Sequence, residues 1–251
     1  MRTLTVINQK GGVGKSTTAL AIGQGLLLKG YKVLFVDLDV QGNMTFSMQA
    51  NIKGYNSLGV LQRPETALKE IQHKAQGDII ASTPALAEVE KQLTQTGKEY
   101  RLKEALENVK ELYDYCIIDT PPALNVLTIN ALTAAEGVII PTQADMYSMQ
   151  GISQLADTIE AVQKYTNPRL SIIGILITRF NARANVRKAV ANMLEGIAKQ
   201  LHTKVFRTRI RECTAVVEAQ AYKKSIYEHA PTCNAVADYT ALITELLNEE
   251  N

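Results

Sequence analysis

The sequence predicts an α/β fold: a doubly wound, mostly parallel sheet with helices on both faces. Short apolar runs alternate along the chain with longer segments of helical periodicity. The runs are apolar almost without interruption, which is typical of parallel strands covered on both faces. No internal repeat, low-complexity segment or linker rich in Pro, Gly or Ser divides the chain. We therefore expect residues 1–251 to form one domain.

Six apolar runs predict strands, and six segments with apolar residues three and four positions apart predict helices. In chain order the predicted strands are Thr3–Asn8, Lys32–Asp37, Asp78–Ser82, Tyr115–Asp119, Gly137–Pro141 and Ser171–Thr178. The predicted helices are Ser16–Lys29, Arg101–Tyr113, Leu124–Ala134, Gln150–Tyr165, Asn185–Gln200 and Asn234–Leu247. Ligands of such folds bind at the carboxyl ends of the strands, so we expect functional residues directly after them.

The segment between the first predicted strand and the first predicted helix is rich in glycine. The general phosphate-binding pattern GxxxxGK[ST] requires a glycine where Gln9 stands, but Lys10–Ser16 matches the variant KGGxGK[ST], which adds the lysine Lys10. A glycine-rich turn with an incidental lysine is the alternative, and the flanking strand and helix argue against it. Glycines let consecutive backbone N–H groups surround phosphate oxygens, while the following helix directs its N-terminus at them. The sequence therefore predicts a nucleotide site made of Gly11, Gly12, Val13, Gly14, Lys15, Ser16 and Thr17.

Aspartates stand at the ends of two predicted strands. Asp119 ends an apolar run in the Walker B arrangement, in which the carboxylate holds a metal ion through water. Asp37 and Asp39 end another run, and we expect Asp39 to orient or deprotonate an attacking water while Asp37 supports the loop or the metal shell. A single aspartate at a strand end is usually a turn or helix cap. Three of them after a phosphate loop favour a metal-dependent hydrolytic site, with Ser16 as a further Mg²⁺ ligand.

Together these motifs resemble those of the ParA/MinD family of deviant Walker A ATPases, and most closely the ParA/Soj partition ATPases. The resemblance covers essentially the whole chain and is strongest in Lys10–Ser16, Asp37–Asn43 and Asp119–Pro122. It implies ATP and Mg²⁺ as cofactors and a homodimer that encloses two ATP molecules. In that dimer Lys10 of each protomer would contact the partner's phosphates, as an arginine finger does. The implied catalytic residues are Lys10, Lys15 and Asp39, and the implied metal ligands are Ser16, Asp39 and Asp119.

The chain departs from the family pattern at two places. Val40 stands where the family commonly has proline, which leaves the segment after Asp39 less restrained. The family's Ile-Pro-Arg-Asn stretch appears here as Ile210–Cys213. In the family this stretch and the end of the strand before it line the base pocket, so the resemblance implies nucleotide contacts for Arg179 and Arg211.

Positive charge is concentrated in the C-terminal third, although the net charge is only +2. Between residues 179 and 211 the chain has nine Lys or Arg and a single acid, Glu195. A solvated helix face is the alternative to a binding surface. The resemblance implies non-specific DNA binding by the ATP-bound dimer and a ParB-like adaptor protein as partner, and DNA binding of this kind weakens as salt rises. The predicted DNA-binding residues are Arg183, Arg187, Lys188 and Arg209.

Other function classes fit the sequence less well. A MinD-like membrane-cycling ATPase would need a basic amphipathic helix at the C-terminus, but Glu245–Asn251 is acidic. A reductase resembling the nitrogenase iron protein would need paired cysteines, and Cys116, Cys213 and Cys233 show no such spacing, so we expect reduced structural thiols. A metabolic P-loop kinase would need an acceptor-binding insertion that is not apparent. With neither a signal peptide nor a membrane span expected, we predict a cytoplasmic protein without membrane contact. The resemblance implies that it is associated with the nucleoid.

Overall fold

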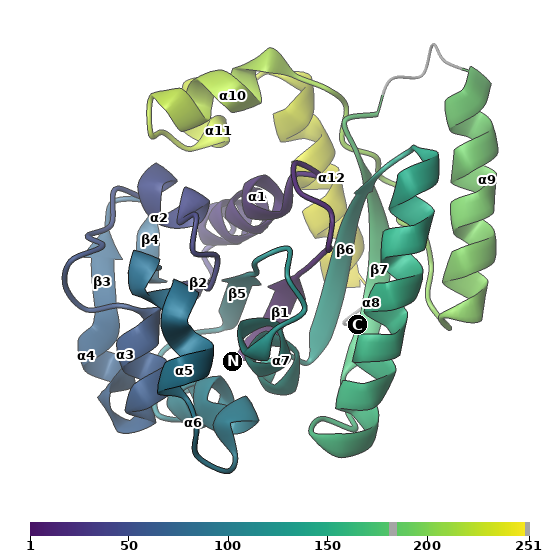
Figure 1. Ribbon diagram of the computed structural model, residues 1–251. Helices are drawn as coiled ribbons and strands as arrows, with labels where there is room; N and C mark the ends of the chain where they lie inside the picture. The colour runs from purple at the N-terminus through teal and green to yellow at the C-terminus, as the bar shows by residue number, and fades with distance from the viewer. Residues whose placement is uncertain (181–184, 249–251) are drawn as a thin grey trace.

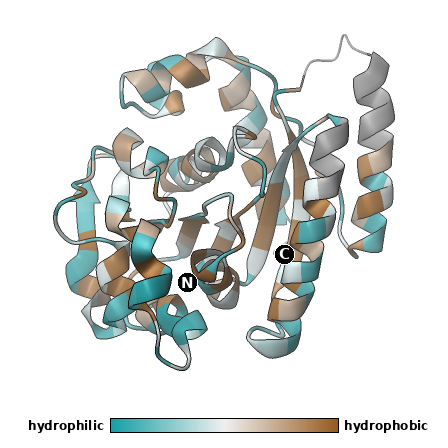
Figure 2. Cartoon of the chain, viewed as in Figure 1, coloured by the Kyte–Doolittle hydropathy of each residue, from teal (hydrophilic) through white to brown (hydrophobic). Residues whose placement is uncertain are grey.

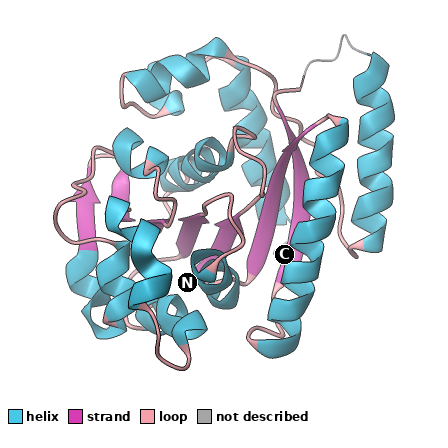
Figure 3. Ribbon diagram, in the orientation of Figure 1, coloured by secondary structure: helices cyan, strands magenta, loops and turns pink. Residues whose placement is uncertain are grey.

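The computed structural model describes residues 1–180 and 185–248 (Figure 1). Among these residues seven strands form one sheet in the order β3-β4-β2-β5-β1-β6-β7, and only β3, at one edge, runs antiparallel to its neighbour (Figure 3). The strands are β1 (Arg2–Val6), β2 (Val33–Asp37), β3 (Ile71–Lys74), β4 (Gly77–Ile80), β5 (Tyr115–Asp119), β6 (Gly137–Gln143) and β7 (Ser171–Thr178). The predicted doubly wound, mostly parallel α/β fold is thus confirmed.

Helices lie on both faces of the sheet, with α8 and α9 beside the β6–β7 edge (Figure 1). Their bounds are α1 (Lys15–Leu28), α2 (Asn43–Ser47), α3 (Ser57–Gln62), α4 (Ala67–Glu70), α5 (Val89–Gln92), α6 (Arg101–Glu107), α7 (Val126–Ala134), α8 (Met146–Tyr165), α9 (Asn185–Gln200), α10 (Thr214–Ala221), α11 (Ile226–His229) and α12 (Asn234–Asn248).

The sequence prediction was wrong by four residues or more at two helix ends and missed several short elements. The helix predicted over Gln150–Tyr165 begins at Met146. The helix predicted over Arg101–Tyr113 ends at Glu107, after which the chain continues in tight turns. Asn108 explains the stop, because its side-chain amide donates to the carbonyls of Pro64 at 3.2 Å and Glu104 at 3.0 Å. The missed elements, such as β3 and α10, are short, and their form depends on what they pack against.

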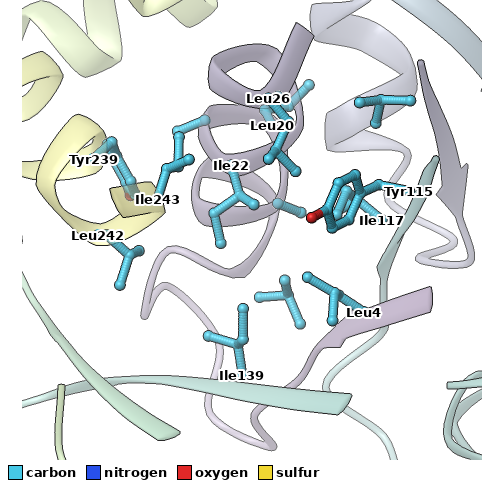
Figure 4. Close-up of a cluster of buried hydrophobic side chains, with 14 of the residues drawn as sticks. Leu4, Leu20, Ile22, Leu26, Tyr115, Ile117, Ile139, Tyr239, Leu242 and Ile243 are labelled. Atoms are coloured by element: carbon cyan, nitrogen blue, oxygen red, sulfur yellow. The ribbon is translucent and has the colours of Figure 1, made fainter. Parts of the chain in front are cut away.

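Successive residues of the central strands face opposite sides of the sheet. On β2, Val33 and Phe35 belong to the core cluster that includes α1 and α12, whereas Leu34 and Val36 belong to the cluster that includes α3, α6 and α7. Hydrophobic residues accordingly run along strands such as β6 and β7 (Figure 2). Figure 4 shows the first cluster, with its labelled residues Leu4, Leu20, Ile22, Leu26, Tyr115, Ile117, Ile139, Tyr239, Leu242 and Ile243. Burial on both faces explains the uninterrupted apolar runs in the sequence.

The outer edge of β7 is occupied by the segment that follows α9. Ile175 accepts a backbone hydrogen bond from Phe206 at 3.0 Å, and Ile177 accepts one from Ile210 at 2.9 Å. This pairing continues beyond the strand, where Phe180 forms a parallel bridge with Arg211. The segment at residues 205–211 is thereby held beside the carboxyl end of β7.

Strand register brings the ends of three central strands level. Val6 of β1 and Asp37 of β2 are both register partners of Asp119 of β5. The loop that follows β1, the aspartates that follow β2 and the end of β5 therefore meet at the carboxyl edge of the sheet.

Candidate active site

The glycine-rich loop leads directly into α1, and its residues Gly11 and Gly12 are exposed. Gly12 and Gly14 have φ angles of 74° and 88°, in the region that disfavours side chains, so glycine is required there by the backbone. Gly14 precedes the first residue of α1, and no side chain caps this helix end. The first amides of a helix have no intrahelical acceptor. An anion such as phosphate satisfies them and also interacts favourably with the helix dipole.

Polar residues at the ends of β1, β6 and β7 fix the loop to the sheet. The Thr178 hydroxyl lies 2.8 Å from the Val13 carbonyl oxygen and 3.1 Å from that of Thr142. The Gln143 amide donates to the Gly12 carbonyl at 3.1 Å, and Asn8 accepts from the backbone N–H of Lys10 at 2.9 Å. Sequence reasoning did not assign these anchors. Their signal was a polar residue directly at the end of an apolar strand.

Lys15 is buried beneath the loop. Its Nζ lies 3.4 Å from the Lys10 carbonyl oxygen, and the charges of Asp119 and Asp39 act on it. Burial lowers the pKa of Lys15, and the two carboxylates oppose that shift. A lysine with so few polar partners is suited to receive the oxygens of a bound phosphate.

Asp119 is fully buried, and neither of its carboxylate oxygens has a hydrogen-bond partner among the described residues. Burial, and next the charge of Asp37, raises the pKa of Asp119 well above the ordinary carboxyl range. The Ser16 hydroxyl is near enough to lower that pKa, although it completes no hydrogen bond of ordinary geometry. An unsatisfied carboxylate beside a hydroxyl suits Mg²⁺, which prefers oxygen ligands and retains waters. The described residues contain no cluster of three or more His, Cys, Asp or Glu that would hold a metal ion alone, so phosphate and water would supply other ligands.

Asp37 and Asp39 have different environments. Asp37 accepts hydrogen bonds from the backbone and hydroxyl of Thr45, at 2.8 and 2.7 Å, and from the backbone of Asp39 at 3.1 Å. Burial raises its pKa to about 6 despite these bonds. Asp39 accepts from the backbone of Gln41 at 3.0 Å, and its carbonyl accepts from the Ser82 hydroxyl at 2.5 Å. Asp37 thus fixes the first turn of α2, whereas the Asp39 carboxylate has capacity to contact a metal ion or water.

Lys10 is held at the rim of the site. Its Nζ donates to the Asp145 carboxylate at 2.6 Å, and each side chain retains about a third of its exposure. Asp145 follows β6, so the ion pair joins two loops that are far apart in the sequence. Lys10 and Lys15 therefore have different positions: Lys15 is buried under the loop and Lys10 is partly exposed beside it.

A polar cleft adjoins the loop, lined by Gln143, Ala144, Asp145, Arg179 and Glu212. Arg179 has a φ of 48° and forms an ion pair with Glu212 at 2.9 Å. The nucleotide contact predicted for Arg179 stays a prediction, but the residue does line this cleft.

Two other residues predicted to contact nucleotide form bonds to C-terminal helices. Arg211 pairs with Asp238 of α12 at 2.6 Å, and the Thr17 hydroxyl accepts from Gln220 of α10 at 2.8 Å. Whether either one contacts nucleotide stays a prediction.

The residues predicted to bind DNA are only partly placed. Arg183 lies outside the described residues, as do the side chains of Arg187 and Lys188, whose backbone belongs to α9. Arg209 is placed, and its guanidinium lies 4.8 Å from the centre of the Phe180 ring.

The fold and the site define the chain as a P-loop nucleotide-binding protein of the α/β class. A family model described as an AAA domain matches residues 1–172. Soj of Bacillus subtilis, a sporulation initiation inhibitor protein, is 39% identical over 249 residues, and the match covers 97% of each chain. The chromosome-partitioning ATPase Soj of Thermus thermophilus is 37% identical, with 98% of this chain and 96% of that protein covered. The chain therefore belongs to the ParA/Soj family of partition ATPases, and it is an ATPase.

A solved structure is similar over its full length. Cobyrinic acid a,c-diamide synthase of Mycobacterium smegmatis, with a bound ATP analogue and magnesium, matches with a TM-score of 0.86 and 32% identity. The match covers all of this chain and 96% of that one. The expectation of ATP and Mg²⁺ agrees with the ligands of that structure.

Asp119 gives a prediction about pH and stability. A carboxyl group whose pKa is raised by folding stabilises the protein below its unfolded pKa and loses that contribution as pH rises through the folded pKa. Asp119→Asn should therefore stabilise the nucleotide-free, metal-free protein at pH 8, by about 1–3 kcal/mol, because it removes an unsatisfied buried charge. The gain over wild type should vanish towards pH 4, where the wild-type carboxyl is also neutral. Thermal melts of both proteins in EDTA measure it, and a less stable variant at pH 8 would contradict the environment described for Asp119.

Proposed function

We propose that this protein is a ParA-like ATPase that dimerises around ATP, binds DNA without sequence preference and uses hydrolysis to segregate a plasmid, chromosome region or mobile element. The placement of Lys10 carries the proposal. One lysine under the loop suffices to bind a nucleotide, and the second one, at the rim, is paired with Asp145 within the protomer. A partly exposed cation beside the phosphate loop is suited to contact phosphates held by a second copy.

Hydrolysis is assigned to the residues that meet at the carboxyl edge of the sheet. Lys15 and the loop amides hold the phosphates, Asp39 orients the attacking water, and Asp37 positions Asp39 through its backbone. Mg²⁺, held by Ser16 and by Asp119 through water, with Asp39 nearby, would neutralise charge that develops on the transferred phosphoryl group. Lys10 of the partner protomer would add positive charge from the far side, so catalysis depends on dimerisation.

Lys10→Ala tests the dimer. The wild-type protein should double its mass with a non-hydrolysable ATP analogue but not with ADP, as measured by light scattering after gel filtration. Lys10→Ala should bind the analogue within about threefold of wild type, because Lys15 is retained, yet stay monomeric. Lys29→Ala, an exposed lysine at the end of α1, is the matched control and should dimerise. A wild-type protein that stays monomeric with the analogue would contradict the proposed dimer. A Lys10→Ala protein that dimerises would contradict only the role proposed for Lys10.

DNA binding is proposed for the surface around α9 and the segment at residues 204–211. Some of its positive charge is paired, since Arg211 contacts Asp238 and Arg179 contacts Glu212. Arg209 instead lies over the Phe180 ring. Its guanidinium is held in place by that contact while it remains partly exposed, which suits a phosphate contact made without reading base sequence.

Arg209→Glu should weaken binding of the analogue-loaded protein to a random-sequence duplex by about tenfold at low salt, and should reduce the slope of affinity against salt. Fluorescence anisotropy measures both quantities. Lys69→Glu is the matched control, because it makes the same charge change at an exposed position of α4, far from the C-terminal segment in the sequence. Equal DNA affinities for the two variants would place the DNA contact elsewhere on the protein. DNA binding that is equally tight without the ATP analogue would contradict the proposed dependence of DNA binding on ATP.

A ParB-like adaptor as partner and a location at the nucleoid complete the proposal. Both are supported by membership of the family, and the expectation that the protein makes no membrane contact belongs to the same proposal. No helix among the described residues is long and apolar enough to span a membrane.

A further inference from the structure

Side chains from the sheet hold two successive carbonyl oxygens of the glycine-rich loop. The Gly12 carbonyl accepts from the Gln143 amide at 3.1 Å, and the Val13 carbonyl accepts from the Thr178 hydroxyl at 2.8 Å. Gln143 ends β6 and Thr178 ends β7, and the two residues are register partners, so both donors stand at the same edge of the sheet. Thr178 is only 3% exposed, which shields its bond from water.

The direction of each of these carbonyls fixes the direction of the next amide. The described residues contain no cis peptide bond, and in a trans peptide the C=O and the N–H point to opposite sides. Because the Gly12 and Val13 carbonyls are directed at their donors, the N–H groups of Val13 and Gly14 are directed away from those donors. A methyl group placed on Gly12 or Gly14 would meet no atom within 4 Å, so open space lies beside the loop.

A loop of this composition needs such a restraint. Gly12 and Gly14 have φ angles of 74° and 88°, but glycine adopts many other backbone conformations at little cost, so the peptide planes on either side of Val13 can turn easily. A reversed plane would direct a carbonyl oxygen, instead of an N–H group, towards a bound phosphate. The two groups of negative charge would repel each other, and a hydrogen bond to the phosphate would be lost.

We propose that Thr178 and Gln143 are positioning residues for nucleotide binding. By holding the carbonyls of Val13 and Gly12, they keep the N–H groups of Gly14 and Val13 directed at the bound phosphates. Neither side chain needs to contact the nucleotide for this role. The inference concerns the binding of phosphates, which ADP and ATP share, so it is independent of dimerisation and of DNA binding.

Isothermal titration calorimetry with ADP and Mg²⁺ tests the role of Thr178. Thr178→Val replaces the hydroxyl by a methyl group of nearly the same size, and it should weaken ADP binding by about tenfold because the Gly14 amide is no longer held towards the phosphates. Thr178→Ser keeps the hydroxyl and should bind within about twofold of wild type. Thr5→Val is the matched control, because it removes a buried hydroxyl that donates to the Ala131 carbonyl of α7, at 3.2 Å, and it should bind ADP as wild type does.

Three results of this titration would overturn the role of Thr178. The first is an ADP affinity of Thr178→Val equal to that of wild type. The second is an equal loss in Thr5→Val, which would assign the effect to lost stability rather than to the loop. The third is a Thr178→Ser protein as weak as Thr178→Val, which would assign the effect to lost packing rather than to the hydroxyl.

The amide resonance of Gly14 reports the direction of its N–H group. Val13–Gly14 is the only Val–Gly pair in the sequence, so valine labelled with ¹³C at the carbonyl, together with ¹⁵N-glycine, gives a single carbonyl-filtered amide signal. A hydrogen bond to phosphate should move the Gly14 amide proton downfield when ADP and Mg²⁺ saturate the wild-type protein. The movement should be smaller in Thr178→Val, and equal movement in the two proteins overturns the role of Thr178.

Gln143→Met gives a second test, at a partly exposed side chain whose replacement should leave the fold intact. Methionine keeps the length of the side chain but has no N–H to donate to the Gly12 carbonyl. Glycine labelled with ¹³C at the carbonyl, together with ¹⁵N-valine, selects three amides, those of Val13, Val60 and Val138. ADP should move the Val13 signal less in Gln143→Met than in wild type, and an unchanged response overturns the role of Gln143.

Discussion

Lys15→Gln should reduce the affinity for ATP by about 100-fold or more. The substitution retains a side chain of similar length but removes the charge that faces the phosphates, and a charge-assisted bond in a buried site is worth about 1.5–3 kcal/mol on its own. Loss of the favourable charge also leaves the phosphates beside Asp119 and Asp39, whose charges act on Lys15 in the nucleotide-free site. Isothermal titration calorimetry with ATP and Mg²⁺ measures the change.

The nucleotide-free form provides the folding control for that variant. Burial lowers the pKa of Lys15, so the charged lysine costs stability without a ligand, and the neutral glutamine should fold at least as stably. Lys29→Gln, at the exposed end of α1, should bind ATP as wild type does. A well-folded Lys15→Gln protein with unchanged affinity would remove the phosphate site from this loop.

Asp39→Ala should lower the rate of ATP hydrolysis by about 100-fold or more and leave ATP bound. General-base or water-orienting residues typically contribute factors of 10²–10⁴. The loop amides and Lys15 are untouched, so ATP affinity should stay within about tenfold of wild type. The backbone of this segment should hold, because the Ser82 hydroxyl and the Gly42 N–H both contact the carbonyl of residue 39 rather than its side chain.

Steady-state phosphate release and equilibrium binding of a fluorescent ATP analogue separate the two effects. Asp157→Ala makes the same change at an exposed position of α8 and should leave both quantities unaltered. Loss of binding together with hydrolysis would show that Asp39 holds the nucleotide complex rather than the attacking water. Unchanged hydrolysis would transfer the water-orienting role to another group.

The fold, and the place in it of the residues proposed for the site, were predictable because their determinants are local. Parallel strands appear as uninterrupted apolar runs, and the loop between β1 and α1 carries its glycines in sequence. The ends of neighbouring parallel strands meet at one edge of the sheet, so aspartates at those ends come together. Asp37 and Asp119 do so because they are register partners on β2 and β5.

The remainder depends on contacts between distant parts of the chain. Lys10 and its partner Asp145 are 135 positions apart, and Thr178 reaches Val13 across 165. Whether a basic side chain forms an ion pair also depends on distant parts of the chain, as the contact of Arg211 with Asp238 shows. No sequence pattern within a single helix or strand indicates such pairs.

The two edges of the sheet bear on how copies of the chain assemble in solution. Exposed strand edges invite further strands to add, and proteins suppress this with short polar edge strands or by covering the edge. Here β3 is short and polar, ending in Lys74, while the segment at residues 205–211 already pairs with β7. Both features disfavour extension of the sheet by a further strand. The dimer proposed above would therefore form through other surfaces, which include the one where Lys10 lies.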